Sequence, residues 1–151
     1  METCQSIFLA QSDTTIGFLC KDFTRLNHIK GRDVKQNAIL TLDSLQKLKN
    51  HVRIPNKYKK EIRYLHKSTF IIHKKSYLKN PGIRLIKGKH AEFLSFFEGL
   101  YSTSANPHAK SFSLDFALKA AQIVVLDKRG LKELKPSKIY AINHHAKKRI
   151  R

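Results

Sequence analysis

The sequence is poor in several features, and each shortage excludes a class of protein. Two cysteines, Cys4 and Cys20, among 151 residues are too few for a disulfide framework or a four-ligand zinc site. The apolar runs extend over only a few residues, against about 20 for a membrane-spanning helix. The acidic Glu2 precedes the first apolar stretch, where a secretory signal would carry positive charge. We therefore expect a cytoplasmic protein with no membrane partner.

Familiar catalytic motifs are missing as well. The sequence contains no Walker loop, no G-x-G-x-x-G, no H-E-x-x-H and no G-x-S-x-G. Ser, His and Asp occur without the spacing of a catalytic triad, which argues against a nucleophilic hydrolase. The one close histidine pair, His144-His145, lies in a basic tail. We expect no metal site built from protein side chains.

Acidic residues are scarce, and the resulting charge is unevenly distributed. The 30 Lys plus Arg outnumber the 11 Asp plus Glu, which leaves a formal net charge of +19. No Lys or Arg occurs in the first twenty residues, whereas fourteen lie between Lys47 and Lys89 beside a single acid, Glu61. A second cluster runs from Lys128 to Arg151. This asymmetry favours a polyanionic partner or substrate, and a generally lysine-rich surface is the alternative that charge alone leaves open.

The hydrophobic pattern predicts short strands alternating with short helices. A helix over 22–29 has Asp22 to cap its start and Gly31 to end it, and Ser113 precedes a helix over 114–121. Asn80-Pro81-Gly82 marks a hairpin turn. We therefore expect an α/β fold with a mixed sheet, in one domain over residues 1–151. The other expected elements are strands at 6–11, 38–42, 69–73, 83–86, a buried one at 123–126 and a last one at 139–142, with helices at 43–48, at 55–65 with Leu65 on its apolar face, and at 93–97 with Phe96 on its apolar face.

Three polar clusters follow predicted elements and could bind a ligand. Ser12-Asp13-Thr14-Thr15-Ile16-Gly17 comes directly after the first strand, where hydroxyls can reach a ligand in the crevice at the strand end. Lys30-Gly31-Arg32 ends a helix, and Gly31 allows both cations to turn toward one anion. Ser102-Thr103-Ser104-Ala105-Asn106-Pro107 supplies a dense patch of hydroxyl and amide groups after a strand. A self-bonded turn, a helix cap and a turn before the next helix are the respective alternatives.

In this order the three clusters resemble the motifs of the YrdC/YciO family, whose active members are threonylcarbamoyl-adenylate synthases. The family has a Thr-Asp-Thr-x-Tyr-Gly loop, a Lys-x-Arg motif and a Ser-Thr-Ser-Ala-Asn stretch. The chain offers residues 12–17, Lys30 with Arg32, and residues 102–106 at these places. Order and spacing agree from Ile7 to Tyr140, as in a short single-domain member. Weaker matches are Ser68-Thr69-Phe70, Ile83-Arg84-Leu85 and Pro136-Ser137-Lys138-Ile139.

The resemblance implies a YrdC-like twisted mixed sheet with flanking helices around a positively charged concave cleft. It implies a nucleotidyltransferase that makes threonylcarbamoyl-AMP and pyrophosphate from L-threonine, bicarbonate and ATP with magnesium. The product would serve threonylcarbamoyladenosine modification of tRNA, through a threonylcarbamoyl transferase complex. The residues implied for the nucleotide phosphates and the carboxylated amine are Lys30, Arg32, Ser104 and Asn106, and those implied for threonine are Thr14, Arg84, Thr103 and Ser137.

The chain departs from the family pattern at several positions. Gln11 stands where the family has Pro, Ile16 where it has Tyr, and Lys138 where it has Thr. These changes fall on the threonine and adenine pockets rather than on the Lys-x-Arg and Ser-x-Asn pairs. With the excess charge between Lys47 and Lys89, they motivate an alternative, a YrdC-like protein that has lost synthase activity and binds double-stranded RNA or tRNA. A ribosome-associated basic protein without a pocket is a third hypothesis.

Overall fold

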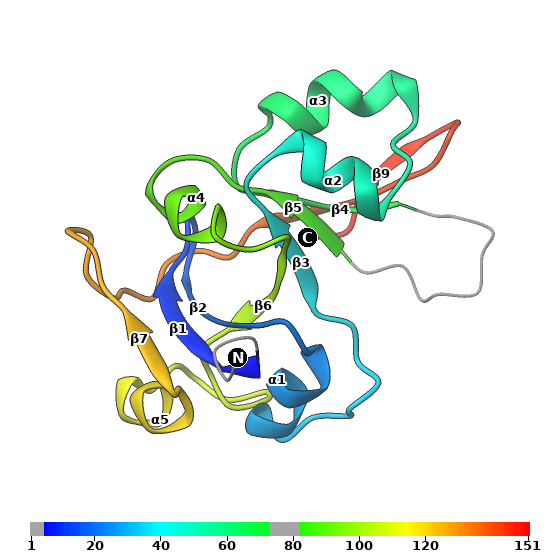
Figure 1. Cartoon of the computed structure of the whole chain (residues 1–151). Coiled ribbons are helices and arrows are strands. Elements are labelled where there is room, and N and C mark those ends of the chain that lie inside the picture. Colours follow the sequence, from blue (N-terminus) through cyan, green and yellow to red (C-terminus); the bar gives the residue numbers. More distant parts are fainter. Residues whose placement is uncertain (1–4, 73–81) are drawn as a thin grey trace.

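The computed structural model describes residues 5–72 and 82–151, and over these residues nine strands form one sheet in the order β7-β1-β2-β6-β3-β5-β4-β8-β9 (Figure 1). The sheet is mixed, because β1/β7, β3/β5 and β4/β8 pair in parallel and the other neighbours pair antiparallel. This confirms the expected α/β class. The strands are β1 (Phe8–Gln11), β2 (Ile16–Cys20), β3 (Ile39–Leu42), β4 (Ser68–Ile72), β5 (Gly82–Leu85), β6 (Leu100–Ser104), β7 (Ile123–Val125), β8 (Lys138–Ile142) and β9 (Lys147–Arg149).

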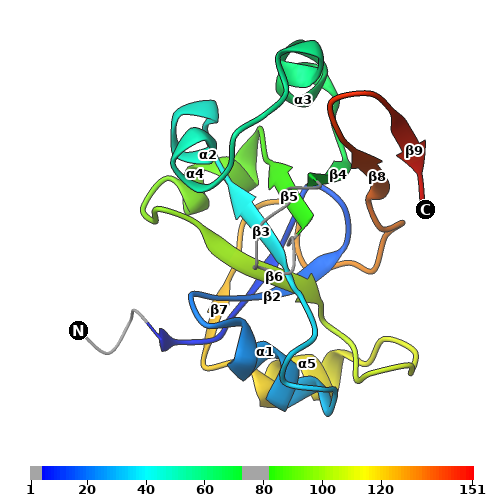
Figure 2. The same ribbon diagram turned by 90° about the vertical axis from the view of Figure 1, so that its right-hand side faces the viewer.

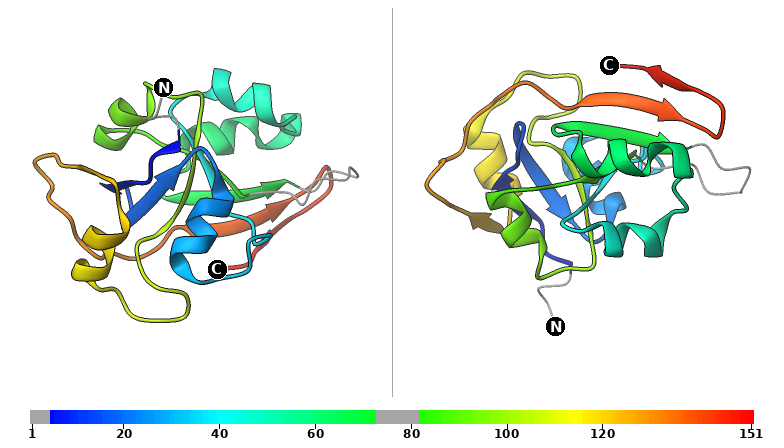
Figure 3. Two further views of the ribbon diagram at one scale, coloured as in Figure 1. Left: turned by 60° about the horizontal axis from the view of Figure 1, so that its bottom comes forward. Right: turned by 90° about the horizontal axis from the view of Figure 1, so that it is seen from above.

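Over the described residues, five α-helices flank this sheet as two pairs and one single helix (Figures 2 and 3). The pair α2 (Leu45–His51) and α3 (Lys59–Tyr64), with the short 3-10 turn η2 (Asn56–Tyr58), lies at one end of the molecule. The pair α1 (Phe23–Lys30) and α5 (Leu114–Ala120) lies together at the other end. The helix α4 (Lys89–Leu94) lies near β1 and β2. Among the described residues, no helix combines the length and the apolar character needed to cross a membrane.

Strand β1 shows how the sequence distributes its apolar residues between two faces of the sheet. Successive side chains of a strand point to opposite faces. Leu9 accordingly packs with the residues of α1 and α5, while Phe8 and Ala10 pack with Leu94 of α4. The Phe8 ring meets that of Phe93 edge to face, with centroids 5.3 Å apart. Burial on both faces fixes the strand that leads into the first polar cluster.

The predicted helix caps are confirmed. Asp22 accepts a hydrogen bond from the backbone N–H of Thr24 at 2.8 Å. Gly31 ends α1 with φ of 67°, a conformation that a residue with a side chain adopts at a cost. Ser113 caps α5 through the N–H of Phe116. Local rules therefore determine where these two helices begin and end.

The predicted hairpin is confirmed as well, because β4 and β5 pair antiparallel. The predicted turn residues Asn80 and Pro81 and the strand end His73 lie outside the described residues, as does Cys4. Within the described part of the chain, Cys20 on β2 is a buried cysteine without a disulfide. On the side away from β5, β4 pairs in parallel with β8, and this pairing brings the chain around Ser137 next to Thr69.

Several predictions about the elements were wrong. No strand was predicted at β2. The third polar cluster was placed after a strand, whereas β6 itself extends through Ser104. The basic tail contains the strand β9, which was not predicted. The strand β7 is an edge strand instead of a buried one, so Val124 and Leu126 are 38% and 68% exposed. Phe96 lies beyond the end of α4 and is 83% exposed, and Leu65 lies beyond α3 and is 37% exposed.

Candidate functional site

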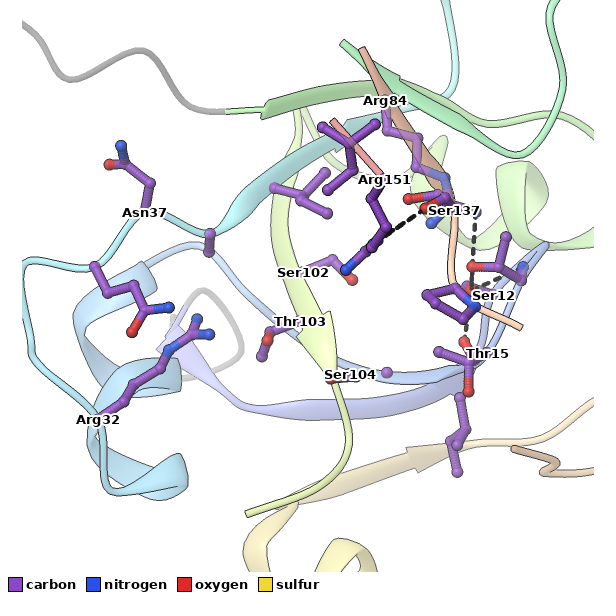
Figure 4. A pocket seen from close by; sticks show the side chains of 18 residues that line it. Ser12, Thr15, Arg32, Asn37, Arg84, Ser102, Thr103, Ser104, Ser137 and Arg151 are labelled. Atoms are coloured by element: carbon purple, nitrogen blue, oxygen red, sulfur yellow. Dashed lines mark hydrogen bonds between the residues drawn. The ribbon is translucent and has the colours of Figure 1, made fainter. Parts of the chain in front are cut away.

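A cavity of about 320 Å³ lies where the β1–β2 loop, β6, the start of β3 and the chain flanking β8 and β9 meet (Figure 4). Its volume is at the lower end of the range for small-molecule sites. Six of the eight predicted site residues line it, from five separate parts of the chain, and two of the eight do not. The six are Thr14, Arg32, Arg84, Thr103, Ser104 and Ser137, and the two are Lys30 and Asn106.

One wall of the cavity is strand β6. It lies between β2 and β3, which both pair with it antiparallel, and its residues Ser102, Thr103 and Ser104 all line the cavity. The neighbouring Gly17 allows β2 to lie close to β6, because a Cβ at this position would be 3.0 Å from the Thr103 carbonyl oxygen. The serine-rich run is therefore held on a regular strand.

The β1–β2 loop satisfies both interpretations of its sequence. The Ser12 hydroxyl donates to the Thr15 carbonyl at 2.6 Å and accepts from the Thr14 N–H at 3.1 Å, which closes the expected turn. This turn presents Thr14 and Thr15 to the cavity. The self-bonded turn is thus the device that displays the hydroxyls.

Arg84 on β5 is the most buried charge of the cavity, at 6% exposure. Its Nη2 donates to the Asp13 carboxylate and, at 2.9 Å, to Thr14 Oγ1. Burial raises the pKa of Asp13, and the Arg84 guanidinium opposes that rise. Arg84 Nε is buried and has no hydrogen-bond partner among residues 5–72 and 82–151. Arg84 thus keeps donor capacity in a cavity whose lining also contains hydroxyl groups.

Ser137 enters the cavity beside Arg84, just before β8 (Figure 4). Its hydroxyl lies 2.8 Å from that of Thr69 on β4. Its carbonyl accepts hydrogen bonds from Nε and Nη2 of Arg151, at 3.2 and 3.1 Å. Arg151 also lines the cavity and was missed by the sequence reasoning. The missing signal was β9, which turns the chain back along β8 and so returns Arg151 to Ser137.

Arg32 lies at the opposite side of the cavity from Ser137 (Figure 4). The buried Asn27 holds it by accepting from Arg32 Nε at 2.5 Å, while donating to the carbonyls of Val34 and Gln36. Arg32 Nη2 is buried and finds no hydrogen-bond partner within the described part of the chain, and burial lowers the pKa of Arg32. A buried donor without a partner on a cavity wall suits an anionic ligand.

Lys30 lies behind this wall, at the end of β6. Its Nζ donates to the Ser104 carbonyl at 2.5 Å, to Ser104 Oγ at 3.3 Å and to Asn106 Oδ1 at 3.1 Å. The structure thus brings together three of the four residues predicted for phosphates. Burial first, and the charge of Arg32 second, lower the pKa of Lys30 to about 8. That Lys30 and Arg32 grip one common anion stays a prediction.

The substituted positions of the first loop have defined surroundings. Gln11 is 5% exposed, donates from Nε2 to the Thr14 carbonyl at 3.1 Å and accepts from the Lys132 N–H at 2.6 Å. Ile16 is 1% exposed and lines the cavity as it begins β2. Gln11 therefore braces the loop through hydrogen bonds that a proline could not make.

Protein side chains offer little to a metal ion here. Within residues 5–72 and 82–151, no group of three or more His, Cys, Asp or Glu is arranged to hold one. Hydroxyl groups and arginines dominate the cavity instead.

Comparison of the fold with solved structures gives three informative neighbours. A variant of P. abyssi Sua5 superposes with a TM-score of 0.78 at 14% identity, over 97% of this chain and 49% of that one. P. abyssi Sua5 complexed with L-threonine gives 0.72 at 15%, over 91% and 47%. E. coli YciO gives 0.76 at 17%, over 97% and 82%.

These similarities show that the chain has the YrdC-like fold that the motif order implied. The chain spans about half the length of the Sua5 structures and most of YciO. No protein-family model and no curated protein matches the sequence.

Proposed function

We propose that the chain is an L-threonylcarbamoyladenylate synthase, an enzyme that converts L-threonine, bicarbonate and ATP into threonylcarbamoyl-AMP and pyrophosphate. The observation that carries the proposal is the arrangement of the cavity. Arg84 and Ser137 lie at one side, Arg32 lies at the other, and the hydroxyls of β6 lie between them (Figure 4). Thr14 belongs to the side of Arg84, to which it is hydrogen-bonded. A cavity with an arginine at each side and hydroxyl groups between them complements a ligand that has two anionic ends and a polar middle. An amino acid joined to a nucleotide is a ligand of this kind.

The side with Arg84 suits threonine. A guanidinium attracts a carboxylate by its charge and its N–H donors, and hydroxyl groups recognise another hydroxyl. In the proposal Arg84 holds the threonine carboxylate, and Thr14, Thr103 and Ser137 contact its polar groups. The structural neighbour Sua5 has been solved with L-threonine bound, which supports a search for the same ligand here.

The side with Arg32 suits the phosphates of ATP. Arg32 would contact them with its guanidinium, whose Nη2 has no hydrogen-bond partner among the described residues. Ser104 would contact them from β6, with Lys30 and Asn106 fixing its position. Arg151 adds a third cavity arginine. Magnesium would enter as part of the ATP substrate, bound by the phosphates.

The chemistry of this reaction needs no protein nucleophile. The threonine amine and bicarbonate form a carbamate with loss of water. A carbamate oxygen then attacks the α-phosphorus of ATP, the bond to the bridging oxygen breaks, and pyrophosphate leaves. The protein has to align the reactants and stabilise charge at the phosphorus. In the proposal these tasks fall to Arg84 on β5, to the hydroxyls of β6 and to Arg32 in the segment after α1.

Identification of the product tests the proposal. Purified protein incubated with ATP, magnesium, L-threonine and bicarbonate should form threonylcarbamoyl-AMP, detected by mass spectrometry, and the mass should rise by one with ¹³C-bicarbonate. Serine in place of threonine is the control for the substrate. Formation of only ADP, or of only AMP without any threonylcarbamoyl-AMP, would contradict the proposal. A threonylcarbamoyl transferase complex would then deliver the group to tRNA.

Because Lys30 titrates near pH 8, we expect the ATP affinity to depend on pH. Bound phosphate favours the protonated ammonium, so above pH 8, where Lys30 titrates, ATP binding must take up a proton. We expect the ATP affinity to fall by up to roughly tenfold per pH unit between pH 8 and 10. The stability of the ligand-free protein has the opposite pH dependence. Between pH 8 and 10.5 Lys30 holds fewer protons in the folded state than in the unfolded state, so the free energy of unfolding rises with pH there.

Calorimetric titrations with ATP at several pH values measure this effect. The variant Lys30→Met lacks the titrating group, so its ATP affinity should be low and nearly independent of pH in this interval. An equal slope in the wild type and in Lys30→Met would show that another group is responsible.

Binding to RNA is a second candidate function, and strand β9 favours it. The edge strand β9 consists of Lys147, Lys148 and Arg149, all exposed. The helix α3 with exposed Lys59 and Lys60 lies close by, because Lys147 pairs with Glu61. Double-stranded RNA binding that weakens steeply with salt would support this function, and an affinity insensitive to salt would contradict it.

A further inference from the structure

The segment between β7 and β8 contacts the β1–β2 loop from outside the cavity, and Arg129 is its central contact. We infer that Arg129 is a positioning residue, which clamps the β1–β2 loop and thereby sets the geometry of the threonine side of the cavity. The inference rests on the proposed function for the identity of the ligand. The clamp itself rests on contacts of the ligand-free protein.

Arg129 bridges two consecutive carbonyl groups of the loop. Its Nη1 donates to the Ser12 carbonyl at 3.0 Å and its Nη2 to the Gln11 carbonyl at 2.9 Å. Its Nε donates to both carboxylate oxygens of Asp127, at 3.0 and 3.1 Å. This bond to Arg129 lowers the pKa of Asp127 to about 2. The guanidinium fork is therefore held in one orientation, with its free donors directed at the loop.

Three further hydrogen bonds continue the contact along the same segment. The Lys132 N–H donates to the Gln11 side chain at 2.6 Å, and the Lys132 carbonyl accepts from the Ile16 N–H at 3.1 Å. The Leu134 N–H donates to Thr15 Oγ1 at 3.1 Å. The segment 127–134 thus follows the loop from Gln11 to Ile16 and is fastened to it at both ends.

The β1–β2 loop forms part of the cavity wall, and the segment 127–134 leads into another part of it. The β1–β2 loop presents Thr14 to Arg84, and the other segment continues directly into Pro136 and Ser137, which also line the cavity. Arg129 does not line the cavity, and its donors are directed at two carbonyls and Asp127. Through these contacts it fixes Thr14 relative to Ser137, and its charge also opposes the rise that burial causes in the pKa of Asp13.

Replacing Arg129 should for this reason weaken the binding of one substrate and spare the other. In Arg129→Ala we expect the dissociation constant for threonine to rise roughly ten- to hundredfold, because displacement of aligned groups by about 1 Å has effects of that size. ATP affinity should stay within about twofold, because Arg32 and Ser104 lie outside the clamped segments. Arg129→Lys should recover part of the loss, since one ammonium cannot bridge both carbonyls and Asp127.

Titration of threonine and of ATP into the wild type and the variants measures both constants separately. Lys128→Ala is the matched control, because it removes an exposed cation from the neighbouring position. Equal threonine affinity in the wild type and in Arg129→Ala would overturn the inference. So would an equal loss of threonine and ATP affinity, which would indicate general destabilisation.

Amide hydrogen exchange of the ligand-free protein tests the clamp independently of any substrate. Arg129→Ala should exchange faster than the wild type at residues 12–16 and 132–137 and at the same rate in α1 and α2. Unchanged exchange at both segments would overturn the clamp. A wild type that does not bind threonine would overturn the proposed function and the threonine part of the inference, and the exchange result would still decide the clamp.

Discussion

Arg84→Ala is expected to lower the threonine-dependent activity by at least 100-fold and to destabilise the protein by about 3–5 kcal/mol. The two losses have one cause, since Arg84 is both the partner of the half-buried Asp13 and the cation proposed for the threonine carboxylate. Without it, a carboxylate whose side chain is 17% exposed has lost its counter-charge. Initial rates against threonine concentration and urea unfolding curves measure the two effects.

Two further variants separate the role in binding from the role in folding. Arg84→Met combined with Asp13→Asn removes both charges and should recover much of the stability without recovering activity, because a buried pair can be replaced by neutral groups at little cost. Arg84→Lys keeps the charge without the fork, so its activity should be intermediate. A wild-type kcat/KM for threonine in Arg84→Ala would contradict the proposed role.

Arg32→Ala is expected to show the second largest effect, a loss of roughly 100-fold in ATP affinity. A charge-assisted bond to a phosphate contributes roughly 1.5–3 kcal/mol, and Arg32 offers a buried donor to which no other described residue is hydrogen-bonded. Threonine affinity should be unchanged, because Arg32 lies at the other side of the cavity from Arg84 (Figure 4). Separate titrations of the two ligands measure this selectivity.

Lys35→Ala is the control for Arg32→Ala, since Lys35 is an exposed cation of the same loop. It should bind ATP like the wild type at moderate ionic strength. An equal loss of ATP affinity in both variants would assign the effect to the general positive charge of the molecule. A loss of threonine affinity in Arg32→Ala would contradict the assignment of the two substrates to opposite sides.

The sequence predicted best what neighbouring residues decide. Asp22, Gly31 and Ser113 were identified as helix ends because a cap needs only a few adjacent residues. Strand β2 escaped prediction because a strand buried on both faces lacks the alternation that marks a half-buried one. Strand β9 escaped for the opposite reason, since its three residues are all basic and exposed.

The site was predictable where its residues match a motif and not where they depend on distant pairing. Thr14, Arg84 and Ser137 are far apart in the sequence, and the order of the motifs was enough to group them. Arg151 and Arg129 reach the site through strand pairing and a long connection, which no local pattern reveals. The charge of +19 likewise divides into a few arginines with defined positions in the cavity and a larger surplus on the surface.

Pyrophosphate release in an omission series tests the central claim most directly. The protein is incubated with magnesium and ATP, and L-threonine and bicarbonate are left out in turn. The account predicts that pyrophosphate forms only when all three substrates are present, and that Arg32→Ala and Arg84→Ala reduce the rate while Lys35→Ala does not. Pyrophosphate release that is independent of threonine, or none from the complete mixture, would contradict the proposed function.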